Sequence, residues 1–437
     1  MDAKSTFMRC GAGRADITPP VGTPMGGFAN RLMPCQGARD RLSARALFLH
    51  TADASALIIT LDALAVNPAR TQQLRDIAVR VGGVAGVQAD HIQITCSHTH
   101  SGVDLAGLRL RADIARINRI NDYFDHVCAA VRDAVGAACA DTAPATLGLG
   151  TMPFVIGRNR RLRPGHANVT DLERSQGENI DQALTVLRFT HAERSTPIAT
   201  LFQIACHPVC LGPENVFASG DFAGIAAQLV EAHTGAPALF LNGAAGNVTP
   251  LIGRGSSYDA TRGLAQTLAD AVYAIDLHPE PAELRCSSPT VAQLPLSCRF
   301  TNDDDIDRQA MWLLGQKTEF PSWPSVVAGW QSRMRSQLAA GQLPATIDIP
   351  LSATRIGGTT FVFAGAELFN EYQLWQPPNA RLVSYANGEC CYVPTSAALA
   401  SGGYEVTTSP VFYGLPCAPG EDAELVLLDA IHRASRL

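Results

Sequence analysis

The first 250 residues alternate between short apolar runs rich in β-branched side chains and longer stretches with apolar residues at helical spacing. Residues 56–60 and 91–95 have the composition of buried strands. Residues 71–81, between them, have the spacing of a helix that crosses between parallel strands. Further strands are predicted at 200–204, 238–241 and 360–364, and further helices at 125–139 and 222–233. This alternation predicts an α/β fold of mixed β-sheets flanked by helices.

The whole chain, residues 1–437, is expected to form a single domain. Hydrophobic residues make up 46% of it, which is enough for a sizeable core, and no internal repeat is visible. Residues 276–292 are expected to form a linker or a surface loop. Residues 302–343 are predicted to form a helical insert that carries three of the four tryptophans. The insert would either cover a pocket or pack as a surface pair of helices.

Charge and hydropathy exclude several classes of partner. Charged residues make up 17% of the chain, the net charge is −6 and the pI is near 6.0, so nothing favours nucleic acid or an anionic membrane. No stretch approaches the roughly 18 apolar residues that span a bilayer, and we expect no stable membrane insertion. The N-terminus lacks the apolar run of a secretory signal. The twelve cysteines form no regular framework, so we expect reduced, mostly buried thiols and a cytoplasmic protein.

Two histidines, His98 and His100, directly follow the predicted strand at 91–95. Side chains alternate along a strand, so residues two positions apart should point the same way. Neutral imidazole is the commonest nitrogen ligand of zinc in proteins. The pair therefore forms a good half-site for a metal ion, although such a pair can also be purely structural.

Two later segments also follow predicted strands. His207 lies between a cysteine and a proline after strand 200–204, and Asp221 stands just before a helix. His207 could bind a metal or be an ordinary core histidine, and Asp221 could simply cap its helix. Residues 242–250 are rich in small side chains that let the backbone approach a ligand or another strand. They lack the Gly-Lys-Ser/Thr ending of a phosphate loop, so nucleotide binding is not expected.

Taken in order, these segments resemble the catalytic domain of the neutral/alkaline non-lysosomal ceramidases. The resemblance extends over about residues 10–410 in collinear blocks. The matching blocks are residues 13–20, 97–102, 157–160, 207–208, 219–221 and 242–250.

The resemblance implies a zinc site with ligands from both ends of the chain. It makes His98 and His207 ligands and requires a glutamate and a tyrosine from the C-terminal third. Glu367 occupies the expected place, and Tyr392 and Tyr404 have the twelve-residue separation of the family's tyrosine pair. We therefore expect His98, His207, Glu367 and Tyr392 to bind Zn²⁺, with Tyr404 as a hydrogen-bond donor on the substrate side. The alternative is that Tyr392 is an ordinary strand residue.

Zinc with an open position activates water and polarises a carbonyl group, so the site would attack an amide or an ester carbon. His100, close to a ligand but not itself one, would pass a proton to the leaving amine. Tyr404 and Arg160 would stabilise the oxyanion or hold a carboxylate of the substrate. Asp62, after strand 56–60, would support a metal ligand from behind or merely cap a helix.

Two features depart from the family. The loop at 242–250 ends in Thr249-Pro250 where the family has Ser-Pro, and the Thr249 hydroxyl could still act as a catalytic hydrogen-bond donor. The family also carries a C-terminal β-sandwich domain, for which no residues are expected here. That absence, with the lack of an export signal, weakens ceramide as the substrate.

The sequence therefore predicts a zinc-dependent amidohydrolase that uses a zinc-activated water on an acylated or small amide. A zinc esterase or lactonase would use the same site, and so would a biosynthetic acyl transfer or cyclisation. A family member that binds a ligand without turnover is the alternative from another class. The expected partner is a small-molecule or acyl-amide substrate, and a homo-oligomer is compatible with the sequence.

Overall fold

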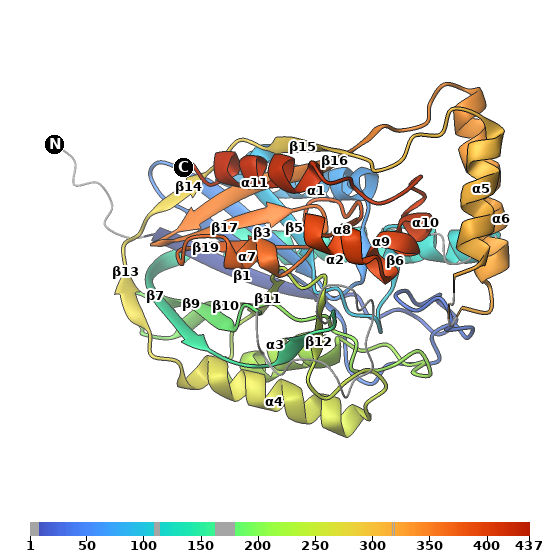
Figure 1. Ribbon diagram of the computed structural model, residues 1–437. Coiled ribbons are helices and arrows are strands. Elements are labelled where there is room, and N and C mark those ends of the chain that lie inside the picture. The colour runs from blue at the N-terminus through green and yellow to red at the C-terminus, as the bar shows by residue number, and fades with distance from the viewer. Residues whose placement is uncertain (1–7, 109–113, 162–179, 317, 319) are drawn as a thin grey trace.

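Two β-sheets packed face to face, with helices on their outer faces, form the framework of the computed structural model (Figure 1). The structure describes residues 8–108, 114–161, 180–316, 318 and 320–437. Within them, the apolar pattern predicted the elements well, because each strand and helix expected from it has a counterpart. The expected class of mixed sheets flanked by helices is confirmed.

The larger sheet has nine strands in the order β11-β10-β9-β7-β1-β2-β3-β5, with β13 also paired to β7. Most neighbours are antiparallel, but β3 with β5 and β10 with β11 are parallel. Its strands are β1 (Met8–Asp16), β2 (Ser43–His50), β3 (Ser55–Leu61), β5 (Ile92–Cys96), β7 (Ala143–Pro153), β9 (Ala183–His191), β10 (Pro197–Ile204), β11 (Ala238–Asn242) and β13 (His278–Glu280).

The second sheet has five strands in the order β14-β16-β17-β19, with β15 also paired to β16. They are β14 (Leu284–Cys286), β15 (Thr290–Pro295), β16 (Thr346–Ile356), β17 (Thr359–Ala364) and β19 (Ala380–Val383). Three two-stranded pairs lie outside both sheets: β4 (Ala65–Val66) with β6 (Asp104–Leu105), β8 (Gly157–Asn159) with β12 (Val248–Pro250), and β18 (Glu367–Leu368) with β20 (Tyr392–Val393). The expectation of a linker at 276–292 is wrong, because β13, β14 and part of β15 occupy it.

Alternation along the strands divides the core into layers. On β2, Leu47 and Leu49 face the second sheet, whereas Ala46 and Phe48 face the helices. The outer face of the larger sheet is covered by α1 (Pro68–Gly82), α2 (Ile114–Ala140), α3 (Asp221–Thr234) and α4 (Tyr258–Ala274). The outer face of the second sheet is covered by α11 (Ala423–Ala434). Figure 1 shows α3 and α4 on one side of the sheets and α11 on the other.

Two strand–helix–strand crossovers connect the parallel strands of the larger sheet. Helix α1 joins the parallel strands β3 and β5, as expected, and α3 joins β10 and β11. The start of α1 is well defined, because the Asn67 side chain accepts a hydrogen bond from Arg70 N and Pro68 is the first helical residue. The two parallel pairs run in opposite directions along the sheet, because the five steps from β10 to β3 are all antiparallel. The ends of β5 and β11 nevertheless meet, since the Asn242 side chain donates to Ser97 O at 3.1 Å.

The predicted insert is helical and consists of α5 (Asp303–Leu314) and α6 (Trp323–Ala339), which stand at one end of the molecule (Figure 1). Trp323 and Trp330 are buried against Phe412 and its neighbours on α10 (Ser409–Tyr413), whereas Trp312 is exposed. Cys298 forms a disulfide with Cys417, so the expectation that all cysteines are reduced is wrong for this pair. The remaining short helices are α7 (Glu371–Leu374), α8 (Ser396–Ser401) and α9 (Tyr404–Thr407). None of the described helices combines the length and the apolar character needed to cross a lipid bilayer.

Candidate functional site

The expected ligands come together where the carboxyl ends of strands from both sheets meet. His98 and His100 follow β5, and His207 follows β10. Glu367 opens β18, just after β17, and pairs with Tyr392 of β20 in a parallel register. Four segments far apart in the sequence thus contribute to one buried cluster.

The donor atoms of this cluster have the spacing of a metal site. The His98 Nε2 atom lies 3.3 Å from His100 Nε2 and 3.3 Å from Glu367 Oε2. His207 Nε2 also lies 3.3 Å from Glu367 Oε2, and 3.4 Å from the Tyr392 phenol oxygen. In a tetrahedral zinc site with bonds of about 2.0–2.1 Å, neighbouring ligand atoms are roughly 3.3 Å apart. The three histidines form a group that could hold a metal ion.

Backbone carbonyls orient two of the three imidazoles. The His98 Nδ1 atom lies 2.9 Å from Leu64 O, and His207 Nδ1 lies 2.8 Å from Ala245 O. A carbonyl can only accept, so each Nδ1 donates and each Nε2 is left for the cluster. Metal-binding histidines nearly always have such a second partner. His100 differs, because its buried Nδ1 has no hydrogen-bond partner among the described residues.

Strand alternation was expected to point His98 and His100 the same way. This explanation is wrong, because β5 ends at Cys96, before both residues. His98 instead has φ 66, in the left-handed region, and its amide donates to Ala63 O. The ring of Tyr385, itself at φ 58, stacks on His98 at 4.0 Å between centroids. Left-handed residues other than glycine cost about 1–3 kcal/mol each and gather at functional sites.

The segment around residue 27 holds His100 in place. Gly27 has φ 86, and a Cβ there would lie 2.5 Å from the His100 ring, so glycine is required. The Phe28 ring lies 4.8 Å from the His100 ring. Buried Arg31 donates to the His100 carbonyl at 2.7 Å. Packing around the ring and a hydrogen bond to its backbone thus hold His100, whereas Nδ1 hydrogen bonds orient His98 and His207.

Electrostatics make the cluster a site for positive charge. Burial opposes the charged form of His98, but Glu367 and Glu389 outweigh it and raise the pKa of His98 to about 10. Burial lowers the pKa of His207 to about 4, and it lowers the pKa of His100 below its ordinary value, with help from the charge on His98. Burial alone would raise the pKa of Glu367, yet the charge on His98 holds it well below its usual range.

The residues present fit a divalent metal ion. Glu367 Oε2 is buried between two imidazoles, yet no hydrogen-bond donor among the described residues is aligned with it. A buried carboxylate oxygen without a donor is costly unless a cation lies against it. Imidazole nitrogen and carboxylate oxygen are also the donor types that zinc takes.

Arg160 and Tyr404 lie beside the cluster, as expected. Arg160 donates through Nε to Glu405 at 2.7 Å and through Nη2 to the Tyr392 phenol oxygen at 3.3 Å. The Tyr404 ring packs edge-on against Tyr392 at 6.0 Å. Burial raises the pKa of Tyr404, so its hydroxyl remains a donor. Glu405, the residue after Tyr404, was not predicted. Its carboxylate accepts hydrogen bonds from both Arg160 and Arg161.

Thr249 lies on β12, buried and opposite Arg158 of β8. The carbonyl of the preceding Val248 accepts a hydrogen bond from His207 N at 3.1 Å, so this strand fixes the backbone of an expected ligand. The small residues of the loop at 242–250 let its backbone approach another strand closely, as predicted. A Cβ on Gly246 would lie 2.9 Å from the carbonyl of Glu367.

Two further residues at the site were not predicted, Glu389 and Tyr413. The Tyr413 phenol oxygen lies 2.5 Å from Glu367 Oε1 and 2.6 Å from Glu389 Oε1. Glu389 Oε2 lies 3.5 Å from His98 Nδ1, and burial raises the pKa of Glu389 to about 7. Asp62, which was expected behind a ligand, is instead bound to Arg45 at 2.8 Å, so that expectation is wrong.

The segment 219–221 supports the histidine loop rather than the cluster itself. The Ser219 hydroxyl donates to Asp40 at 2.5 Å, and Gly220 N donates to the same carboxylate at 2.8 Å. The Ser219 carbonyl accepts from Thr99 Oγ1 at 2.8 Å, next to both histidines. Asp221 is the first residue of α3, with its carboxylate bound to backbone amides. The interpretation of Asp221 as the N-cap is therefore wrong, because Gly220 occupies that position and Asp221 is already helical.

Asp40 makes stability depend on pH. Burial raises the pKa of Asp40 to about 6, above the ordinary 3.8, so the folded state holds a proton that the unfolded state has lost between these pH values. The contribution of Asp40 is therefore fully present below about pH 4 and is lost as pH rises through about 6. We expect the stability of the wild type relative to Asp40→Asn to fall over this window. The fall is at most about 3 kcal/mol, at about 1.4 kcal/mol per pH unit.

Urea unfolding of both proteins at pH 4.5 and 7.5 measures this difference, and other titrating groups cancel in the comparison. A difference that is constant or grows with pH would contradict the assignment.

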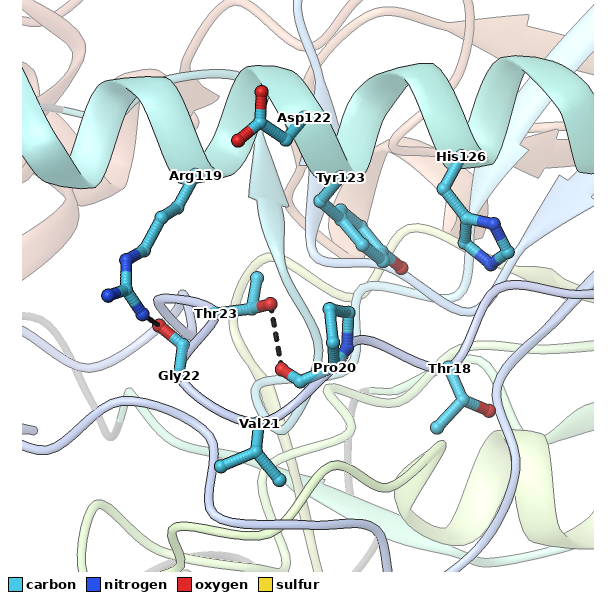
Figure 2. Close-up of a pocket in the computed structure, with 9 residues that line it drawn as sticks. All are labelled: Thr18, Pro20, Val21, Gly22, Thr23, Arg119, Asp122, Tyr123 and His126. Atoms are coloured by element: carbon cyan, nitrogen blue, oxygen red, sulfur yellow. Dashed lines mark hydrogen bonds between the residues drawn. The ribbon is translucent and has the colours of Figure 1, made fainter.

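Figure 2 shows a surface hollow between α2 and the segment 18–23. No residue of the histidine cluster lines it. Arg119 on its wall donates to Gly22 O at 2.8 Å, and the Tyr123 hydroxyl donates to Ile17 O at 2.5 Å. Both of these polar side chains are engaged by backbone carbonyls, and the hollow lies apart from the histidine cluster.

Comparison with known proteins agrees with the geometry. Residues 8–257 match the family model for neutral/alkaline non-lysosomal ceramidase, N-terminal. The structure resembles the neutral ceramidase from Pseudomonas aeruginosa, with TM-score 0.70 and 19% identity over 98% of this chain and 74% of that chain. It also resembles a ceramidase complexed with C2, with TM-score 0.71 and 18% identity over the same shares. No curated protein sequence gives a match.

At such low identity the two structures show the fold alone, whereas the family match covers more than half of the chain. This protein therefore belongs to the neutral/alkaline non-lysosomal ceramidases, a family of hydrolases, and has their α/β fold.

Proposed function

We propose that the protein is a zinc-dependent amidohydrolase that cleaves the carbon–nitrogen bond of an acylated or small amide. The observation that carries the proposal is the position of Glu367 Oε2, 3.3 Å from the Nε2 atoms of both His98 and His207 and without an aligned donor. Membership in a family of hydrolases supports it.

His98, His207, Glu367 and Tyr392 would hold the ion. Zinc, when bound, supplies Lewis-acid activation of a carbonyl group and of water. The Nδ1 bonds of His98 and His207 to backbone carbonyls keep their Nε2 lone pairs directed into the site. Tyr392 differs from the other three, because its phenol oxygen also accepts a hydrogen bond from Arg160.

His100 suits proton transfer better than metal binding. It lacks the second hydrogen bond that orients His98 and His207, and its lowered pKa keeps the ring neutral and able to accept a proton. A protonated His100 would then supply that proton to the departing amine. Arg160 and Tyr404 provide N–H and O–H donors on the same side as Tyr392, where charge develops on the carbonyl oxygen. Thr249 would contribute through its hydroxyl.

Ceramide, which names the family, is the first amide to test. Shorter N-acyl amines and the matching esters complete the substrate series, because the same site could open an ester or a lactone. An ester leaving group needs no proton, so His100→Ala should impair amide cleavage much more than ester cleavage if the enzyme is an amidase.

Metal content tests the proposal directly. We expect about one zinc per chain in the wild type and in His100→Ala, and none in His98→Ala or His207→Ala. His278→Ala, at an exposed position on β13, is the matched control and should retain the ion. Elemental analysis of the purified proteins measures all five. A wild type without zinc, or His98 and His207 variants that keep it, would overturn the proposal.

A further inference from the structure

One carboxylate, Glu389, and one phenol, Tyr413, lie behind the expected ligands, on the side away from the expected metal position. Tyr413 contacts the Oε1 atom of Glu367, whereas the Oε2 atom faces the histidines. Glu389 contacts Tyr413 through Oε1, and its Oε2 lies 3.5 Å from His98 Nδ1. The Glu389 side chain is fully buried, and its Oε2 has no hydrogen-bond donor aligned with it in the described part of the chain.

We propose that Glu389 and Tyr413 are a positioning pair that holds His98 and Glu367 in their metal-binding orientation and strengthens metal binding. The inference rests on the proposed function, because it requires an ion between those two ligands. Neither residue touches the expected metal position; both act through a ligand.

The Tyr413 hydroxyl decides which oxygen of Glu367 faces the metal. A carboxylate can bind an ion through one oxygen or through both. With Oε1 held at 2.5 Å by Tyr413, only Oε2 is free to point between His98 and His207. The ring of Tyr413 also packs edge-on against that of Tyr392 at 6.3 Å, which restricts its own movement. Tyr413 thus favours binding of the ion through a single Glu367 oxygen.

Glu389 contributes charge and completes the link to His98. Carboxylates behind a metal-binding histidine increase the basicity of the ring and fix its orientation. Here the Leu64 carbonyl accepts the hydrogen bond from His98 Nδ1 at 2.9 Å, and Glu389 Oε2, 3.5 Å from the same atom, acts on the ring through its charge. Burying a carboxylate without a cation nearby is unfavourable, so a divalent ion held by His98 Nε2, on the other side of the ring, would offset the cost of burying Glu389.

The backbone that presents Glu389 is held in an unusual conformation. Tyr385 and Asn387 have φ values of 58 and 54, and Gly388 has φ 109. A Cβ on Gly388 would lie 2.8 Å from Pro68 Cα, so only glycine fits there. The Glu389 amide then donates to Val66 O at 2.9 Å. Strain of this kind persists only where the surroundings enforce it, and it is concentrated at functional sites.

The test uses Glu389→Gln, Tyr413→Phe and the double variant, which preserve size. Tyr372→Phe is the matched control, because Tyr372 is also a buried tyrosine, and its hydroxyl donates to Pro394 O away from the cluster. Zinc affinity is measured by competition with a chromophoric chelator. The visible spectrum of the Co²⁺-loaded protein reports the coordination number. Thermal unfolding of the metal-free proteins shows that each variant is folded.

We expect each single variant to bind zinc about 10–100-fold more weakly than the wild type, as for other residues that support metal ligands. The double variant should lose less than the product of the two effects, because the two side chains contact each other and their effects are coupled. Tyr413→Phe should also weaken the Co²⁺ absorption, because a released Glu367 can bind through both oxygens.

The outcomes separate the two proposals. If the wild type and Tyr372→Phe bind zinc tightly while all three variants match them in affinity and spectrum, the positioning pair is overturned and the proposed function stands. If the wild type binds no zinc, both are overturned. Weaker binding in Tyr413→Phe alone would remove Glu389 from the pair and so overturn the inference as stated.

Discussion

Glu367→Gln is expected to lower zinc affinity by about 10²–10⁴-fold and to reduce kcat/KM at limiting zinc by a similar factor. Glutamine has the same size and can still accept a hydrogen bond from Tyr413. It removes the single negative charge that lies 3.3 Å from both His98 and His207, and its amide hydrogens would meet their lone pairs. Breaking a buried charge pair costs roughly 3–5 kcal/mol, which corresponds to this range.

The matched control for this prediction is Glu424→Gln on α11. Glu424 also accepts a backbone hydrogen bond, from Ser396 N at 2.8 Å, but it does not contact the cluster. Chelator competition and initial rates over a zinc titration measure both variants. Saturating zinc should recover part of the activity of Glu367→Gln, because the lost charge acts mainly on binding of the ion. Wild-type affinity in Glu367→Gln would show that the carboxylate is not a ligand.

The framework could be predicted from local signals, and the clustering of the four expected ligands could be predicted from the order of the motifs that resemble the family. The crossover from 56–60 to 91–95 is correct, and the segments after β5 and β10 carry His98 and His207 into one buried cluster. Motif order and the tyrosine spacing then located Glu367 and Tyr392, which the structure pairs side by side on β18 and β20. These features depend on strand ends and short spacings, which a sequence displays directly.

The residues behind the ligands could not be predicted, because tertiary packing alone brings them there. Tyr413 is 46 residues from Glu367, and a left-handed turn at 385–388 aims Glu389 at His98. Strand β13 was missed for a different reason. Its Pro279 indicates a loop. In the described structure, however, β13 pairs with β7 alone and is an edge strand. Proline is tolerated there, because its missing N–H can fall on the side that has no neighbouring strand.

Asp62 was wrongly expected at the site because an aspartate at a strand end has several possible partners. Its actual partner is Arg45 of β2, which is 1% exposed and also binds Glu231 of α3. Arg45 donates through Nη1 to Asp62 at 2.8 Å and through Nε to Glu231 at 2.7 Å. The three side chains join the sheet to the helix that follows the segment 219–221. This network explains Asp62 as a structural residue.

Arg45→Met is expected to destabilise the fold by at least about 3–5 kcal/mol, because it leaves two buried carboxylates without their shared cation. The loss is a large part of the roughly 5–15 kcal/mol that stabilises a typical domain, so the midpoint of urea unfolding should fall sharply. Arg14 still reaches Glu231 at 2.6 Å from the surface, but nothing comparable reaches Asp62 in the described structure. A loss below about 1 kcal/mol would contradict the prediction.

A triple variant separates charge from packing. Adding Asp62→Asn and Glu231→Gln to Arg45→Met removes the two carboxylates, and methionine fills much of the space of the arginine stem. Neutral, well-packed replacements of buried ion networks are often as stable as the original, so most of the lost stability should return. Zinc content per folded chain should match the wild type in the triple variant, because the network does not contact the cluster. Loss of zinc from a folded triple variant would instead place Asp62 behind the metal ligands after all.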